Sequence, residues 1–299
     1  MRPDEIAIAA DWAAAEGWNP GLSDAACFAT IDPDGFLIGE LDGQPAATIS
    51  CVNYDARFAF LGFYIVRGDL RGRGFGLRIW NAAIAHAGAR VIGLDGVVAQ
   101  QDNYKKSGFA LAYANVRYGG TIESPRWPLA SLASAARADE PGYGRVSGAR
   151  TIESRADEPG YGRVSGARAI ESGADEPGSG RASGARTVES PRWPLASLAS
   201  AAAAGVVALS EVPFVALEAD DASVFPAPRP AFLRCWIGAP GQVGRALLRD
   251  GKLAAWGVIR PCRVGYKIGP LVADDRAGAE AVLAALVAGV GGGEIFLDV

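Results

Sequence analysis

Two arginines and three glycines lie close together at positions 71–76, in the order Arg-Gly-Arg-Gly-Phe-Gly. An apolar run rich in aromatic and β-branched residues, Phe58–Val66, precedes them, and apolar residues at helical spacing follow them. The first amides of a helix lack partners within the helix, and the helix dipole places partial positive charge beside them. Glycines let an anion approach the backbone closely, while Arg71 and Arg73 add positive charge. The segment therefore predicts a strand, a phosphate-binding loop and a helix, in that order.

The glycine spacing excludes two common nucleotide-binding loops. It does not match the G-x-G-x-x-G pattern of dinucleotide-binding folds, and it does not match the G-x-x-x-x-G-K-[ST] pattern of P-loop nucleotide hydrolases. On the glycines alone, a turn that binds no ligand is as good an interpretation as a phosphate loop. Motifs elsewhere in the chain must decide between the two.

The arrangement Arg71-x-x-Gly74-x-Gly76 resembles the R/Q-x-x-G-x-G/A pyrophosphate loop of the GNAT superfamily of N-acetyltransferases. Further along, the segment 104–109, Tyr-Lys-Lys-Ser-Gly-Phe, resembles the Y-x-x-x-G-F signature of the same superfamily. The distance between the two motifs also fits, and the resemblance covers residues 4–120. We therefore expect an acyltransferase domain in this part of the chain.

The resemblance implies an α+β fold in which a mixed central sheet carries helices on both faces. It also implies acetyl-CoA as the cosubstrate and transfer of its acetyl group to an amine of unknown identity, with no metal ion involved. The loop would hold the pyrophosphate, and the pantetheine would pair with the edge of the preceding strand as an added strand does. The cofactor-binding residues predicted in this way are Phe63, Tyr64, Ile65, Val66, Arg71, Gly72, Arg73, Gly74, Phe75 and Gly76.

Two residues are candidates for moving protons. Tyr104 matches the superfamily's tyrosine that protonates the leaving thiolate, and a phenol of pKa about 10 can donate a hydrogen bond to a thiolate whose thiol has a pKa of about 8.5. Asp95 is the candidate base for the amine, acting directly or through water, and Glu40 is the alternative. Glu16 and Trp18 are candidates for lining an acceptor pocket. A packed tyrosine and solvated carboxylates are the competing interpretations.

Composition narrows the function further. The chain has 299 residues, of which 49% are hydrophobic, so it can form two packed domains. Its net charge of −4 gives no general attraction to nucleic acid or to anionic membranes. No nucleic-acid or membrane partner is therefore expected. The resemblance implies a small-molecule or peptide amine as the partner, and a homo-oligomer is left open. The only histidine, His86, argues against a histidine-based triad or a metal site with several histidines.

The cysteines and the N-terminus bear on localisation. The four cysteines are widely spaced and form no C-x-x-C pair, which favours buried, reduced thiols: Cys27, Cys51, Cys235 and Cys262. The first residues do not resemble a signal peptide, and no apolar run is long enough to span a membrane. The sequence therefore predicts a cytoplasmic protein.

The first domain, expected at residues 1–120, has the element order of a GNAT fold. We predict helices at 4–15 and 23–29, strands at 36–41, 46–54 and 58–66, a helix from 77 to 87, a strand at 91–98, a short helix at 101–107 and a strand at 110–118. The superfamily usually begins with a strand before the first helix. The first domain is therefore expected to lack that strand.

Residues 121–204 differ in kind from the rest of the chain. The segments 137–154, 155–172 and 173–190 are near-copies of one unit that contains few large apolar residues. Burial of such a unit offers little to offset the entropy lost on ordering it. We predict a disordered, repetitive linker between two domains. A docking repeat anchored by Trp127 and Trp193 is the alternative.

Globular patterning returns at residues 205–299, and the segment 257–271 resembles the C-terminal domain of a bacterial, two-domain GNAT subgroup. We predict a helix at 230–237, strands at 246–249, 253–260 and 266–272, a helix at 277–288 and a strand at 294–299. Asp274 and Asp275 would repel a phosphate, so no second cofactor site is expected. The last strand is expected to leave an open edge in a truncated domain. A CoA-binding or interaction protein without catalysis is the alternative function.

Overall fold

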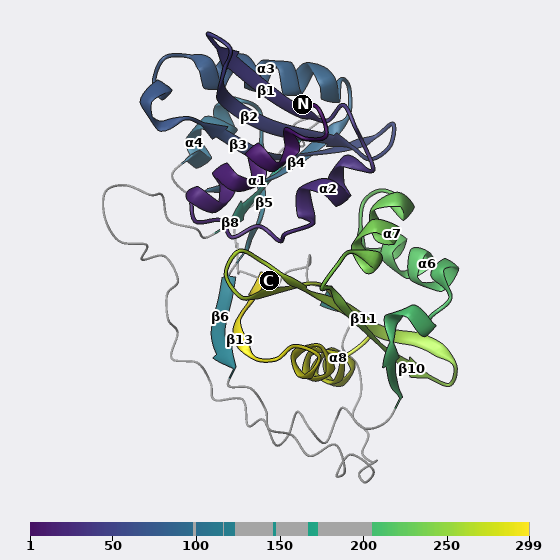
Figure 1. The fold of residues 1–299 in the computed structure, drawn as a ribbon. Coiled ribbons are helices and arrows are strands. Elements are labelled where there is room, and N and C mark those ends of the chain that lie inside the picture. The colour runs from purple at the N-terminus through teal and green to yellow at the C-terminus, as the bar shows by residue number, and fades with distance from the viewer. Residues whose placement is uncertain (98–99, 116, 123–145, 148–166, 173–204, 299) are drawn as a thin grey trace. The chain divides into compact units, whose positions relative to one another are not determined.

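The computed structural model describes the whole chain except residues 98–99, 116, 123–145, 148–166, 173–204 and 299 (Figure 1). The chain divides into two compact units. The first unit comprises Met1–Val116, Glu153–Gly184 and Pro226–Trp236. The second comprises Arg117–Ile152, Ala185–Phe225 and Ile237–Val299. The domain boundary expected at residue 120 therefore lies four residues too late, inside a strand of the second unit.

The first unit has the predicted helices and strands, with ends that shift by a few residues. Its elements are α1 (Ile6–Ala15), α2 (Asp24–Ala29), β1 (Phe36–Leu41), β2 (Gln44–Asn53), β3 (Phe58–Val66), η1 (Gly68–Leu70), α3 (Phe75–Ala87), β4 (Val91–Val97), α4 (Gln101–Lys106), β5 (Ala110–Asn115) and β8 (Ala167–Ser172). Most of α7 (Pro230–Gly238) also belongs to this unit.

The sheet of the first unit is mixed and has the order β1-β2-β3-β4-β8-β5. β1, β2 and β3 are antiparallel neighbours, whereas β3, β4, β8 and β5 pair in parallel. α3 packs on one face, where Trp80 and Ala83 meet apolar side chains of β2, β3 and β4. α1 and α2 pack with Phe36, Val52 and Phe63, from β1, β2 and β3, in a separate cluster. The expected sheet with helices on both faces is confirmed.

The second unit forms its own mixed sheet, in the order β6-β13-β12-β11-β10-β9. Its elements are β6 (Arg117–Ile122), β7 (Val146–Ser147), β9 (Val206–Ala208), η3 (Leu209–Glu211), α6 (Phe214–Val224), β10 (Val243–Arg249), β11 (Lys252–Pro261), β12 (Tyr266–Ala273), α8 (Arg276–Ala288) and β13 (Gly293–Asp298). α8 covers one face of β10, β11 and β12 (Figure 1). Its residues Val282 and Leu286 lie in the core formed with these strands. α6 is not among the elements predicted from the sequence.

The last strand does not leave an open edge, contrary to expectation. β6 pairs antiparallel with β13 along its whole length, from Arg117 opposite Asp298 to Ile122 opposite Gly293. The predicted strand at 110–118 is in fact two strands, β5 in the first unit and β6 in the second. The segment expected to be a linker also supplies β7, which pairs with β12, and β8, which pairs with β4 and β5. Its first two residues, Thr121 and Ile122, end β6, and the rest of the expected linker lies outside the described residues.

The expectation of four reduced cysteines is wrong. Cys27 in α2 and Cys235 in α7 form a disulfide, while Cys51 and Cys262 are free and buried. Burial raises the pKa of the Cys51 thiol to about 12, and the nearby Asp32 carboxylate adds to the effect. The pattern of spacings could not reveal a bond between residues 208 positions apart. No helix among the described residues is long and apolar enough to cross a membrane.

Candidate active site

The predicted phosphate loop lies between β3 and α3. Gly72 has φ +73° and Gly74 has φ +82°, so both adopt the left-handed conformation that favours glycine. Gly74 is the N-cap of α3, and the first bond of the helix runs from the Arg78 amide to the Gly74 carbonyl. The amides of Phe75 and Gly76 precede that bond. They are therefore available to an anion at the positive end of the helix dipole.

Gly76 is required by close packing between α3 and β3. A Cβ atom at this position would lie 2.7 Å from the Tyr64 hydroxyl and 3.2 Å from Val66 Cγ2. The Tyr64 ring also packs against Trp80 of α3, with ring centroids 5.3 Å apart. The third position of the loop motif therefore lets the start of α3 approach the strand that precedes the loop.

β3 and β4 separate beside this loop. Their parallel pairing runs from Phe58 opposite Val91 to Leu61 opposite Leu94 and goes no further, although β3 continues to Val66. Beyond Leu61, the β3 edge that faces β4 has no strand partner among the described residues. The Phe63 and Val66 carbonyls accept side-chain hydrogen bonds from Thr48 and Arg71, and the other backbone groups of this edge can pair with an extended ligand.

A bulge in β3 marks the point of separation. The register with β2 shifts between Thr48 and Ser50, and Phe63 has φ +49°, which is unusual for a bulky residue. The Thr48 hydroxyl donates a hydrogen bond of 2.9 Å to the Phe63 carbonyl. Phe63 and Tyr64 thus face different cores, Phe63 with α1 and α2 and Tyr64 with α3.

Tyr104 lies on α4, packed between α3 and β4. Its ring is 5.9 Å from the Trp80 ring, and a Cβ atom at Gly96 would collide with it. Burial, helped by the neighbouring Tyr64, raises the pKa of Tyr104 to about 12. The phenol therefore stays protonated at neutral pH and can donate a hydrogen bond.

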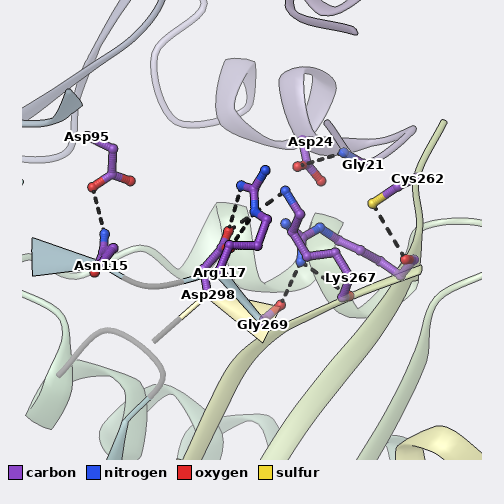
Figure 2. Close-up of polar contacts among 10 residues, drawn as sticks. Gly21, Asp24, Asp95, Asn115, Arg117, Cys262, Lys267, Gly269 and Asp298 are labelled. Carbon is purple, nitrogen blue, oxygen red and sulfur yellow. Dashed lines mark hydrogen bonds and ion pairs between the residues drawn. The ribbon is translucent and has the colours of Figure 1, made fainter. Parts of the chain in front are cut away.

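Asp95 occupies the residue of β4 that directly follows the last pair with β3. It is exposed, and its carboxylate accepts a hydrogen bond of 3.3 Å from the Asn115 side chain of β5 (Figure 2). Because side chains alternate along a strand, Asp95 faces away from Gly96 and hence from Tyr104. The structure places the candidate acid and the candidate base on opposite faces of the sheet, where the strands separate.

Glu40, the alternative candidate base, does not lie where β3 and β4 separate. Glu40 is exposed on β1, the edge strand, and β2 lies between β1 and β3. Glu16, considered for the acceptor pocket, instead forms an ion pair with Arg71 of the phosphate loop. No local pattern in the sequence could have revealed this contact, because the two residues are 55 positions apart. Arg73 lies over the ring of Phe75, with its guanidinium carbon 5.3 Å from the ring centroid.

The second unit repeats the strand separation but not the open start of the helix. β12 and β13 pair in parallel from Tyr266 to Ile268 only. At the start of α8, the Asp275 carboxylate caps the helix by accepting a 2.7 Å hydrogen bond from the Gly278 amide. It also forms an ion pair with Arg249. A side chain of the protein therefore occupies the helix end where a phosphate would bind.

Comparisons with known proteins agree with this architecture. A family model described as "Acetyltransferase (GNAT) family" matches residues 5–109, and one described as "Acetyltransferase (GNAT) domain" matches residues 218–299. A holothin acyltransferase of Pseudoalteromonas sp. is 43% identical over 117 residues, which cover 39% of this chain and 40% of that protein. The chain thus aligns with two fifths of the relative's length.

The fold is also similar to a solved structure. A proposed acetyltransferase from Pyrococcus horikoshii superposes with a TM-score of 0.60 and 19% identity, over 99% of this chain and 77% of that one. At this identity the likeness concerns the fold alone. Together the two family models match more than half of the residues, one in the first unit and the other mostly in the second. The chain therefore belongs to the GNAT superfamily of acyltransferases and carries two GNAT domains.

Proposed function

We propose that the first unit binds acetyl-CoA and transfers its acetyl group to an amine. The observation that carries this proposal is the unpaired edge of β3, which leads directly into the glycine loop and the amino end of α3. An extended, amide-containing chain that ends in a pyrophosphate matches this arrangement of strand edge and anion site. Pantetheine and the pyrophosphate of CoA have this chemistry.

The residues at the separation of β3 and β4 suit acyl transfer from a thioester. The amine attacks the thioester carbonyl, a C–N bond forms and the C–S bond breaks. Asp95 is proposed to take the proton lost by the amine, directly or through water. Tyr104, on the other face, is proposed to donate its hydroxyl hydrogen to the departing thiolate. With its raised pKa, Tyr104 stabilises the thiolate by hydrogen bonding more than by complete proton transfer.

The acceptor is proposed to be an amine on a small molecule or peptide. The curated relative is named for acyl transfer to holothin, so holothin is the first acceptor to test. Family membership alone does not choose the amine, because GNAT folds differ in the residues around the acceptor.

The test is turnover of acetyl-CoA by the full chain, followed as release of free thiol, with holothin and a panel of amines. Acceptor-dependent thiol release that is lost in a Tyr104→Phe variant supports the proposal. Saturable CoA binding without thiol release from any acceptor would instead favour a CoA-binding protein without catalysis.

A further inference from the structure

Glu16 lies at the end of α1 and contacts the phosphate loop from outside it. Its amide donates to the Trp12 carbonyl, so the residue still belongs to the rigid end of the helix. Ala9 and Ala13 are fully buried and anchor α1 on the unit. The carboxylate of Glu16 pairs with the Arg71 guanidinium, and its side chain is 21% exposed against 48% for Arg71.

Arg71 is held from two directions. Its Nε atom donates a 3.0 Å hydrogen bond to the Val66 carbonyl at the end of β3, and its Nη2 atom donates to Glu16. These contacts engage one edge of the guanidinium, because Nε and Nη2 are neighbours on it. The other N–H groups are left for an anion. The Arg71 side chain is therefore fixed beside the loop while some of its hydrogen-bond donors stay available.

Two opposite effects on an incoming pyrophosphate follow from this contact. The negative charge of Glu16 competes with the pyrophosphate for Arg71, but a half-exposed ion pair in water is worth little. Fixing the guanidinium in advance saves the rotamer entropy that a long arginine side chain otherwise loses when it binds a ligand. The pyrophosphate can bind the remaining N–H groups of Arg71 without breaking its contact with Glu16, so we expect the positioning effect to outweigh the competition.

We propose that Glu16 is a positioning residue for the cofactor: from α1, it holds Arg71 ready to receive the pyrophosphate of CoA. This inference rests on the proposed function of the first unit. It gives α1 a part in cofactor binding, since the end of that helix orients a side chain of the loop 55 residues later.

The experiment measures the affinity of the full chain for CoA and for pantetheine, which lacks the pyrophosphate, by isothermal titration. The variants are Glu16→Ala, Glu16→Gln, Arg71→Ala and the double variant of Glu16→Ala with Arg71→Ala. Glu280→Ala is the matched control, because Glu280 pairs with Arg276 on α8 in the same exposed manner. Thermal unfolding of each variant shows that the fold is retained.

Glu16→Ala is expected to weaken CoA binding by about twofold to fivefold, because a half-exposed ion pair can favour one arginine conformation by no more than its own small free energy. Glu16→Gln still accepts the Arg71 hydrogen bond and is expected to keep most of the affinity. Pantetheine binding should not change, and the double variant should bind CoA no more weakly than Arg71→Ala does.

Wild-type affinity in Glu16→Ala, an equal loss in Glu16→Gln, or additive losses in the double variant would each overturn this inference. Failure of the wild-type chain to bind CoA at all would instead overturn the proposed function.

Discussion

The Arg117 guanidinium binds both carboxylate oxygens of Asp298, through a 2.6 Å hydrogen bond from Nε and a 3.0 Å hydrogen bond from Nη2 (Figure 2). The two residues are 181 positions apart and lie opposite each other in the β6–β13 pair. Lys267 of β12 lies 3.8 Å from the same carboxylate. Burial raises the pKa of Asp298, but hydrogen bonds and charge from Arg117 outweigh burial and hold it below its usual range.

This pair fixes the strand that closes the second sheet, so its loss should weaken the second unit. Arg117→Ala is expected to lower the unfolding free energy of that unit by about 1–2 kcal/mol, because a charge-assisted, bidentate contact is lost and Asp298 keeps partial access to water. Thermal unfolding of the full chain measures the change. Arg276→Ala, which breaks an exposed pair on α8, is the control and should have little effect. Equal melting of Arg117→Ala and wild type would show that β6 is held by its backbone alone.

The acid stability of the second unit should depend on Asp275. The hydrogen bond from Arg249 lowers the pKa of Asp275 below its ordinary value of 3.8, and the Gly278 amide adds to this despite some burial. A carboxylate with a lowered pKa in the folded state stabilises the fold above its unfolded pKa and loses that contribution as the pH falls. The difference in melting temperature between wild type and Asp275→Asn should therefore be constant near neutrality and shrink below about pH 4. A difference independent of pH would contradict this.

The number of cofactor sites follows from the two helix ends. α3 presents open amides behind Gly74, whereas the Asp275 side chain occupies the start of α8. The negative charges of Asp274 and Asp275 would also repel a phosphate from the start of α8. We expect one CoA per chain in a titration of the full protein. Two equivalent sites per chain would show that a phosphate can displace the Asp275 side chain from the start of α8.

Tyr104 should affect the rate and not the binding of CoA. Tyr104→Phe is expected to lower kcat by about 10²–10⁴-fold, the usual effect of losing a general acid, with little change in CoA affinity. Because the pKa of Tyr104 is raised to about 12, its proton is retained well above the ordinary phenol range. Ionisation of this residue should therefore cause no fall in kcat below about pH 10. Unchanged turnover in Tyr104→Phe would leave the residue a packing element of the α3–α4 core.

Most helices and strands of the first unit could be predicted from local sequence patterns. β1 and β3 have the predicted bounds, since their apolar runs are flanked by turn residues such as Asp42 and Gly43. The loop residues follow the predicted strand and precede the predicted helix, so sequence order alone places them together.

Contacts between residues far apart in the sequence could not be predicted from local sequence patterns. The pairs Arg117–Asp298, Arg71–Glu16 and Cys27–Cys235 depend on tertiary structure and leave no local signal. The sequence does not predict α6, because the buried acids Asp220 and Asp221 interrupt the apolar pattern expected on the buried face of a helix. Long separation in sequence also explains why an open edge was wrongly expected at β13, because its partner strand β6 precedes it by more than 170 residues.

The central claim, that CoA binds at the glycine loop, is tested most directly by calorimetric titration of CoA into wild type and Gly74→Glu. A Cβ atom at Gly74 meets nothing within 4 Å, so the glutamate fits sterically, although φ +82° strains any side chain there. The new carboxylate would lie at the N-cap of α3 and repel the pyrophosphate. We predict saturable binding to the wild type and its loss in the variant, with the melting of the second unit unchanged. Equal titration curves for the two proteins would contradict the account.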